Sequence, residues 1–374
     1  MKKGTILLLL LVYFSAQAQT ILQPGFSGSE YREMLEIFSR QFDSVPTIPA
    51  PVNYHRVYRS AEVGLKNRWE LWYRNDQKLG VISIRGTVAS FASWLENFYA
   101  AMVPANGTLK LNDSTYFSYH LAKDSNAMVH VGWLVGMASL APSIVRKVND
   151  SYQKGIKEFI IFGHSQGGAI AYLLRSYLQS QQASGAIPND IIWKTYCSAA
   201  PKPGNLFYAY DFDFTTRNGW AYNVSNTSDW VPQTPYSVQT VRDFSRVNPF
   251  VDVSTILGRL PLFPRMYLKS KFRKMDKATN KAQKRFEKYL GRMVAKEVRK
   301  SMPQLVEPDY APGNNYQRAA IPIVLEPDAE YHKKFPEQPG NVFVHHMLEP
   351  YYYLSQIYYP PPAPKGEGSA QGLH

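Results

Sequence analysis

The chain has 374 residues, of which 45% are hydrophobic, so it is long enough to bury a large core in one or two domains. Its single cysteine, Cys197, excludes an intrachain disulfide framework. The net charge of +13 is concentrated in residues 259–300, where fifteen Lys or Arg and three acids give +12. The rest is nearly neutral, which argues against a general nucleic-acid-binding protein.

The N-terminus has the pattern of a secretory signal peptide over residues 1–18. Lys2 and Lys3 form its positive end, residues 6–14 form an apolar run too short to span a bilayer, and Ala16 and Ala18 mark a cleavage site. A retained anchor is the alternative interpretation. We expect cleavage near Ala18, which would leave a secreted or periplasmic protein.

Apolar periodicity predicts a helix over residues 29–42, with Ser29 as its N-cap. Three runs rich in β-branched and aromatic residues follow, and the last two predict an antiparallel hairpin at a sheet edge. These runs are residues 56–60, 69–76 and 79–86. Helices and strands then alternate, which is typical of a mostly parallel sheet covered by helices on both faces. The predicted helices are 90–102, 134–149 and 168–182, and the predicted strands are 158–163, 191–198 and 220–224.

Two segments interrupt this alternation. Residues 104–127 are polar and rich in turn residues, and they predict a long loop or flap. Residues 244–328 form a basic insertion, in which one apolar stripe follows a helix whose other faces carry Lys and Arg. The stripe consists of Leu268, Phe272, Met275, Thr279, Ala282, Phe286, Tyr289 and Met293. We expect one domain at 19–359 that includes this insertion, followed by a disordered Pro/Gly-rich tail at 360–374.

The segment FIIFGHSQGGAIAYLL, residues 159–174, contains the pattern G-x-S-x-G around Ser165. A nucleophilic serine needs a sharp strand-to-helix turn that exposes its hydroxyl, and the glycines two positions away let strand and helix approach. The pattern alone is weak, and a polar residue in a glycine-rich loop is the alternative. An apolar strand before it and a helix after it are the context that the nucleophile elbow of an α/β-hydrolase fold requires.

Such a serine also needs an imidazole base and a carboxylate that orients it, in the chain order Ser, acid, His. Asp229 is the best acid candidate because it directly follows a predicted strand, at the sheet edge where the elbow lies. The aspartates that compete with it lie in less regular segments; they are Asp211, Asp213, Asp243 and Asp252.

The base is expected in the late pair His345 and His346, and the spacing from Ser165 does not decide between them. His332 is a more solvated alternative, and His130 precedes the acid, which is the wrong order.

The reaction also needs two backbone N–H donors for the oxyanion. Gln166 supplies one at the start of the elbow helix. Thr87 supplies the other, because Gly86 lets the chain turn after the strand at 79–86 and exposes the next N–H. An ordinary strand-ending turn is the alternative for this segment.

Five motifs in order resemble the class 3 lipases, the fungal-lipase-like branch of the α/β-hydrolases. They are Arg85-Gly86-Thr87 with Ser93-Trp94-Leu95, Val129-His130-Val131-Gly132-Trp133, the elbow GHSQGG, Ala199-Ala200-Pro201-Lys202-Pro203-Gly204-Asn205, and Asp229-x-Val231-Pro232-x-x-Pro235. The resemblance covers residues 29–354 except the basic insertion. Gln166 and Thr234 depart from it, because leucine is common at both positions.

The resemblance implies Ser165 as nucleophile, Asp229 as acid, His346 as base, and Thr87 and Gln166 at the oxyanion. His346 is preferred to His345 because of its position relative to Tyr351. The long separation between Asp229 and His346 is the main departure in the site.

We therefore expect a secreted serine hydrolase that cleaves carboxylic esters of lipids, as a lipase, phospholipase A1 or carboxylesterase, through an acyl-enzyme. The alternatives are a feruloyl or other polysaccharide esterase, and an inactive lipase-like binding protein. No metal or organic cofactor and no nucleic-acid partner is expected. We also expect residues 265–301 to contact an anionic membrane surface, with packing of the stripe on the domain as the alternative.

Overall fold

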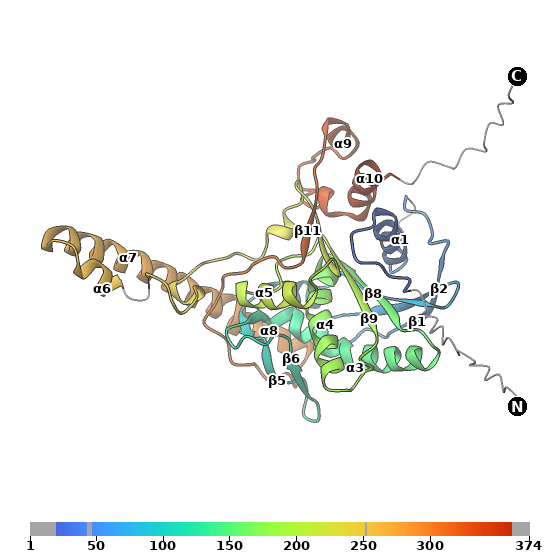
Figure 1. Ribbon diagram of the computed structural model, residues 1–374, viewed down its shortest axis with the longest axis horizontal. Helices are drawn as coiled ribbons and strands as arrows, with labels where there is room; N and C mark the ends of the chain where they lie inside the picture. Colours follow the sequence, from blue (N-terminus) through green and yellow to red (C-terminus); the bar gives the residue numbers. More distant parts are fainter. Residues whose placement is uncertain (1–19, 43–46, 251–252, 361–374) are drawn as a thin grey trace, which may run out of the picture.

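The computed structural model describes residues 20–42, 47–250 and 253–360 (Figure 1). The predicted signal peptide at 1–18 and residues 361–374 of the predicted tail lie outside these residues. The centre of the fold is a seven-stranded sheet in the order β1-β2-β3-β8-β9-β10-β11. Its strands are β1 Tyr54–Arg59, β2 Trp69–Arg74, β3 Leu79–Ile84, β8 Glu158–His164, β9 Ile192–Ser198, β10 Ala221–Asn226 and β11 Ile321–Leu325.

The sheet is parallel from β3 to β11, and β1 and β2 add antiparallel strands at one edge. The predicted hairpin is confirmed, since β2 pairs with β3 in antiparallel register from Trp69 with Ile84 to Tyr73 with Gly80. Because the central strands are covered on both faces, they read as nearly continuous apolar runs; all six residues of β3 are buried.

Helices cover both faces of the sheet, as predicted (Figure 1). One face packs on α3, α4 and α5, in the larger of two hydrophobic clusters, and the other packs on α1 and α10. This arrangement is an α/β-hydrolase architecture with a mostly parallel sheet. The bounds are α1 Gly28–Ser39, α3 Val131–Gln153, α4 Gln166–Ala183, α5 Leu206–Thr215 and α10 Leu348–Tyr358.

The helix ends differ from the predicted ones where a side chain caps the backbone. The N-cap of α1 is Ser27 rather than Ser29, because the Ser27 side chain accepts a hydrogen bond from the N–H of Glu30. Helix α2, Phe91–Phe98, is shorter than the predicted 90–102, since the chain enters strand β4, Met102–Pro104. Helix α3 starts earlier than predicted because the His130 side chain accepts from the N–H of Trp133.

The loop predicted at 104–127 is wrong. Strands β5 Asn106–Lys110 and β6 Tyr116–His120 form a hairpin there, and β4 pairs with β7, Met128–His130. Alternate residues of the hairpin face the core, so Leu109, Phe117 and Tyr119 are buried while their neighbours keep the segment polar.

The predicted insertion at 244–328 also needs correction, because its last part belongs to the domain. Strand β11 pairs with β10 in the central sheet, and Ala295 and Val298 of α8, Val294–Ser301, are buried in the main core. What projects from the body is an arm made of α6 Val253–Gly258 and α7 Leu262–Phe286 (Figure 1). The π-helix η3, Glu287–Met293, joins the arm to α8.

The remaining short elements lie before residue 244 and after residue 328, on either side of the predicted insertion. They are the 3-10 turns η1 Val231–Gln233, η2 Val241–Asp243 and η4 Val344–His346, and the helix α9 Ala329–Lys334.

Candidate active site

Ser165 lies on the turn between β8 and α4 with φ 61° and ψ −131°, so a non-glycine residue occupies the left-handed region. The turn depends on the two flanking glycines. A Cβ on Gly163 would lie 2.1 Å from the carbonyl oxygen of Gly167, and a Cβ on Gly167 would lie 2.2 Å from that of Ile84. The predicted elbow geometry is therefore present.

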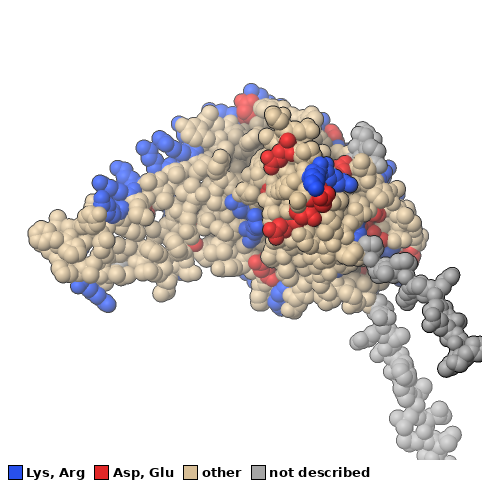
Figure 2. All heavy atoms as spheres, turned by 90° about the horizontal axis from the view of Figure 1, so that it is seen from above, with Lys and Arg blue, Asp and Glu red and all other residues tan. Residues whose placement is uncertain are grey.

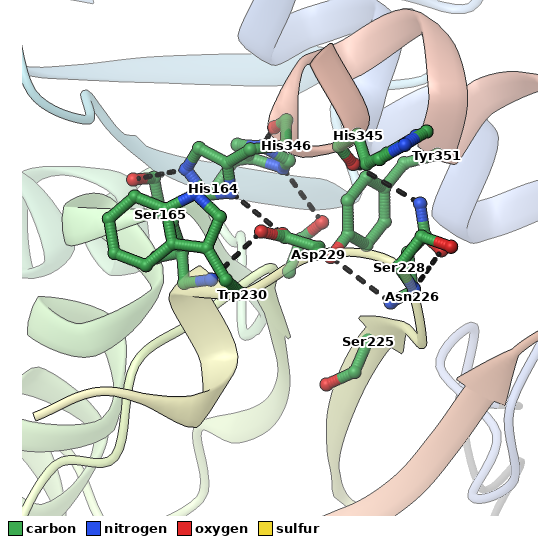
Figure 3. Close-up of polar contacts among 12 residues, drawn as sticks. His164, Ser165, Ser225, Asn226, Ser228, Asp229, Trp230, His345, His346 and Tyr351 are labelled. Carbon is green, nitrogen blue, oxygen red and sulfur yellow. Dashed lines mark hydrogen bonds and ion pairs between the residues drawn. The ribbon is translucent and has the colours of Figure 1, made fainter. Parts of the chain in front are cut away.

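Ser165, His346 and Asp229 form a continuous hydrogen-bonded chain (Figure 3). The Nε2 atom of His346 lies 2.8 Å from Ser165 Oγ, and its Nδ1 atom lies 2.7 Å from Asp229 Oδ2. The Asp229 carboxylate is completely buried and faces the imidazole. This arrangement fixes the Nε2 lone pair toward the hydroxyl, which is what a general base for that serine requires.

The second histidine of the pair points elsewhere. His345 Nδ1 bonds the hydroxyl of Tyr331, 2.9 Å away, and its ring stacks on that tyrosine. His332 lies on α9 with its ring against His345, and His130 is buried at the start of α3. The geometry therefore brings only His346, among the histidine candidates, to Ser165.

The competing aspartates have local structural partners. Asp211 accepts from the N–H of Lys123, Asp213 from that of Ala320, and Asp243 closes a capping box with Thr240. Asp252 lies outside the described residues.

Two donors besides His346 hold the Asp229 carboxylate. The hydroxyl of Tyr351 donates to Oδ2 over 2.7 Å, and the N–H of Val231 donates to Oδ1 over 2.9 Å. These bonds hold the carboxylate in its orientation toward His346.

A third histidine, His164, supports this hydrogen-bonded chain through the backbone of His346. His164, fully buried, donates from Nε2 to the carbonyl oxygen of His346 over 2.8 Å and accepts at Nδ1 from the hydroxyl of Ser198. The Ser198 hydroxyl lies 2.7 Å from that of Tyr31. Burial, and to a smaller extent nearby His346, lower the pKa of His164 from 6.5 to about 3, although the bond to the His346 carbonyl opposes this shift. His164 is therefore neutral and fixes the backbone of His346.

The two predicted oxyanion donors are both available. Thr87 follows β3 and Gly86, Gln166 opens α4, and neither backbone N–H has an acceptor within the described part of the chain. The Asn97 amide links them, since Nδ2 donates to Thr87 Oγ1 and Oδ1 accepts from Gln166 Nε2. The Gln166 amide also donates to the carbonyl of Ser93. This glutamine, at a position where leucine is common in the class 3 lipases, is therefore buried with its amide hydrogen-bonded.

Sequence reasoning missed Asn97 and His164. Ser93 and Asn97 are four positions apart and share one face of α2, which is the sequence signal that could have placed Asn97 near the elbow. His164 had no comparable signal, because its partner is a backbone carbonyl 182 residues away.

The serine lies in a cleft of about 830 Å³. Aromatic side chains, among them Trp94, Trp230 and Phe343, form much of its wall, and Leu290 of η3 closes part of it. The cleft thus combines a few convergent polar groups with apolar walls, as small-molecule sites commonly do.

Within residues 20–42, 47–250 and 253–360, no group of three or more His, Cys, Asp and Glu side chains is placed to hold a metal ion. Of the helices that the structure describes, none combines the length and the apolar character needed to cross a bilayer. Cys197 is buried in β9, and burial raises the pKa of its thiol well above the usual value.

Several solved lipases are similar at low identity. The lipase–propeptide complex of Rhizomucor miehei matches with 18% identity and a TM-score of 0.41, over 57% of this chain and 65% of that one. The Lip2 lipase of Yarrowia lipolytica matches with 16% identity and a TM-score of 0.43, over 57% and 76%.

Two curated relatives match over 163 residues, or 43% of this chain. Secreted mono- and diacylglycerol lipase 1 of Fusarium solani is 28% identical over 40% of its length, and secreted mono- and diacylglycerol lipase 3 of Gibberella zeae is 31% identical over 46%. The chain therefore spans less than half the length of these relatives. Residues 81–239, which run from β3 past the elbow and Asp229, match the model of the class 3 lipases. This part of the chain is therefore similar to the class 3 lipases.

Proposed function

We propose that the protein is a secreted serine hydrolase that cleaves carboxylic esters of lipids through an acyl-enzyme. The observation that carries this proposal is the chain from Ser165 through His346 to Asp229, which opens into an apolar cleft. The match of residues 81–239 to the class 3 lipases supports the same reaction class.

In this mechanism Ser165 Oγ forms a bond to the ester carbonyl carbon while its proton passes to His346 Nε2. The N–H groups of Thr87 and Gln166 stabilise the negative oxygen of the tetrahedral intermediate. The intermediate then expels the alcohol, which takes the proton from His346, and an acyl-Ser165 ester remains. Water repeats the attack with His346 as base, the fatty acid leaves, and Ser165 regains its proton. Asp229 keeps the imidazole oriented and stabilises its charged form.

Lipid esters are the substrate class that the cleft favours. Apolar and aromatic side chains dominate its wall, and its volume of about 830 Å³ accommodates an acyl chain. The two curated relatives are named as mono- and diacylglycerol lipases, which supports acylglycerols as substrates; phospholipase A1 and carboxylesterase activity belong to the same proposal. Their names also support secretion, as does the sequence at residues 1–18. Peripheral contact with an anionic membrane surface through residues 265–301 completes the proposal.

The test is hydrolysis of p-nitrophenyl esters from acetyl to palmitoyl. We expect activity that rises toward long chains and falls by about 10⁴-fold or more in Ser165→Ala. His346→Ala should show a loss of similar size, and His345→Ala is the matched control because its side chain bonds Tyr331 instead.

A fluorophosphonate probe reports on activation of the serine without a chosen substrate. Labelling of the wild type but not of Ser165→Ala is expected. A maximum at acetyl or feruloyl esters would favour the feruloyl or polysaccharide esterase. A folded protein with neither turnover nor labelling would overturn the proposal in favour of a binding protein.

A further inference from the structure

The arm formed by α6 and α7 leaves the body of the domain and is exposed along its length (Figure 1). From residue 261 to residue 281 no side chain is buried, and Gln283 is the buried residue of α7. The apolar stripe predicted along this helix therefore does not pack on the domain there: Leu268 is 43% exposed and Met275 is 68% exposed.

The end of the arm carries a group of strongly exposed apolar side chains. Leu262 is 64% exposed, Phe263 84%, Met266 62% and Tyr267 63%. Positions i, i+1, i+4 and i+5 lie next to one another on a helix, so these four side chains form one patch at the start of α7. Exposed Ile256 of α6 and Leu260 of the connecting loop extend it. We call these six residues the arm tip. A contiguous apolar patch at the end of a projecting arm marks an interaction site.

The charges of the arm select the partner. Eleven Lys and Arg lie between residues 259 and 288, and there is no Asp or Glu from residue 253 to residue 275. None of these eleven side chains forms an ion pair with an acid of the described residues. Two of them, Lys271 and Lys288, lie over tyrosine rings. Figure 2 shows the tan end of the arm with blue Lys and Arg along its length. Two such arms would repel each other, which disfavours a second copy of the chain, whereas an anionic surface would attract them.

We propose that the arm tip inserts into the surface of a bilayer that contains anionic phospholipids, while the Lys and Arg of α7 contact the headgroups. An apolar patch beside a dense set of cations is the chemistry of an interfacial segment, whose apolar side chains enter the boundary between headgroups and acyl chains. This inference deepens the proposed function, on which it rests, because it names the surface from which substrate is taken.

The root of the arm connects this surface to the cleft. Helix α7 runs directly into η3, and Leu290 of η3 lines the cleft that contains Ser165. The carbonyl oxygen of Leu290 accepts a hydrogen bond from the N–H of Ala101, between α2 and β4, and thereby fixes η3 to the body. A docked arm thus holds the cleft next to the lipid surface.

Vesicle co-sedimentation of the full chain tests the inference. Deletion of 265–301 is unsuitable, because it removes Val298, which is completely buried in the core. The variant Leu262→Ser/Phe263→Ser/Met266→Ser should bind phosphatidylcholine–phosphatidylglycerol vesicles at least about tenfold more weakly than the wild type. Val52→Ser is the control variant, because Val52 lies on the body and its side chain is as exposed (83%) as that of Phe263 (84%). This control should bind the vesicles like the wild type. Both variants should keep wild-type hydrolysis of soluble p-nitrophenyl butyrate.

A second measurement reports insertion directly. Because Cys197 is the single cysteine and is buried, Phe263→Cys can be labelled selectively with an NBD dye. Anionic vesicles should shift its emission to the blue, whereas the same dye at Lys274→Cys, on exposed α7, should shift less. Unchanged vesicle binding of the triple variant, or equal shifts at both positions, would overturn the inference. Concentration-dependent self-association that the triple variant abolishes, without vesicle binding by the wild type, would also overturn it. Failure of the proposed function is distinct, since the wild type would then not hydrolyse the soluble ester.

Discussion

Replacement of His130 by Asn should change how the stability of the protein depends on pH. His130 is completely buried at the N-cap of α3, where Nδ1 accepts from the N–H of Trp133 and Nε2 donates to the carbonyl of Asn97. Burial lowers its pKa from 6.5 to about 3, although the bond to Asn97 opposes this shift. Asn can accept the same hydrogen bond from Trp133, so His130→Asn keeps the cap and removes the titration.

The sign and size follow from linkage. Below pH 6.5 the unfolded chain protonates this histidine while the folded chain does not, so the free energy of unfolding falls as the pH falls. From about pH 8 to about pH 5 the loss of unfolding free energy due to His130 is about 2 kcal/mol. The loss continues below pH 5, because the pKa of His130 in the folded chain is about 3. Buried His164 contributes in the same direction, and Glu96, whose pKa is raised by burial, contributes in the opposite one.

Comparison of wild type and variant cancels these other groups. Urea unfolding should show that His130→Asn is less stable at about pH 8, because it loses the bond to Asn97 and the stack on Trp133, whose ring centroid lies 3.6 Å away. The difference should shrink by about 2 kcal/mol at about pH 5, with only about 0.2 kcal/mol of this change between about pH 8 and pH 7. A difference that stays constant with pH would refute the reasoning.

Three further changes probe the fold and the cleft. Burial raises the pKa of the Glu96 carboxyl, whose Oε1 has no hydrogen-bond partner, so the free energy of unfolding of Glu96→Gln should increase relative to wild type by about 1 kcal/mol per pH unit above about pH 4.5. Urea unfolding at several pH values measures this difference. Leu290→Trp should lower kcat/KM for palmitoyl relative to butyryl p-nitrophenyl esters by about tenfold, since the larger ring fills the cleft; an unchanged ratio would remove Leu290 from the acyl site. Gly163→Ala should lower the free energy of unfolding by about 1–3 kcal/mol or more and abolish fluorophosphonate labelling, because its Cβ overlaps the Gly167 carbonyl; full labelling would contradict the elbow geometry.

The parts of the fold that could be predicted have local causes. The elbow combines an apolar strand, two glycines whose Cβ positions are occupied, and a helix, all within sixteen residues. Strand β8 could be found because burial on both faces makes residues 159–162 a continuous apolar run, and β9 and β10 could be found because aromatic and β-branched residues recur in them. Asp229 could be ranked first because it follows β10, whose end lies on the same sheet edge as the elbow.

The parts that were missed have non-local causes. Strand β11 is short and largely exposed, and it pairs with β10, about a hundred residues earlier in the chain. Its amino-acid composition therefore did not separate it from the basic insertion. The hairpin β5–β6 looked like a loop because its outward residues include Asn106, Thr108 and Ser118. Asn97 links Thr87 to Gln166 only through the tertiary fold, and its spacing from Ser93 indicates a shared helix face without identifying these two partners.

A long insertion between Asp229 and His346 would be expected to endanger their alignment, yet they lie 2.7 Å apart across 117 residues. The polypeptide returns to the central sheet before it reaches His346. Strand β11 returns the chain to β10 in parallel register, and Asn226, the last residue of β10, donates to Tyr331 and to the carbonyl of His345.

Tyr351 then fastens α10 to the acid, because its hydroxyl donates to Asp229 and accepts from the N–H of Asn226. His164 fixes the backbone of His346 from the elbow strand. The histidine is thus placed by contacts to β8 and β10 rather than by the length of chain that precedes it. The arm can therefore carry a separate surface function without displacing the base from the serine.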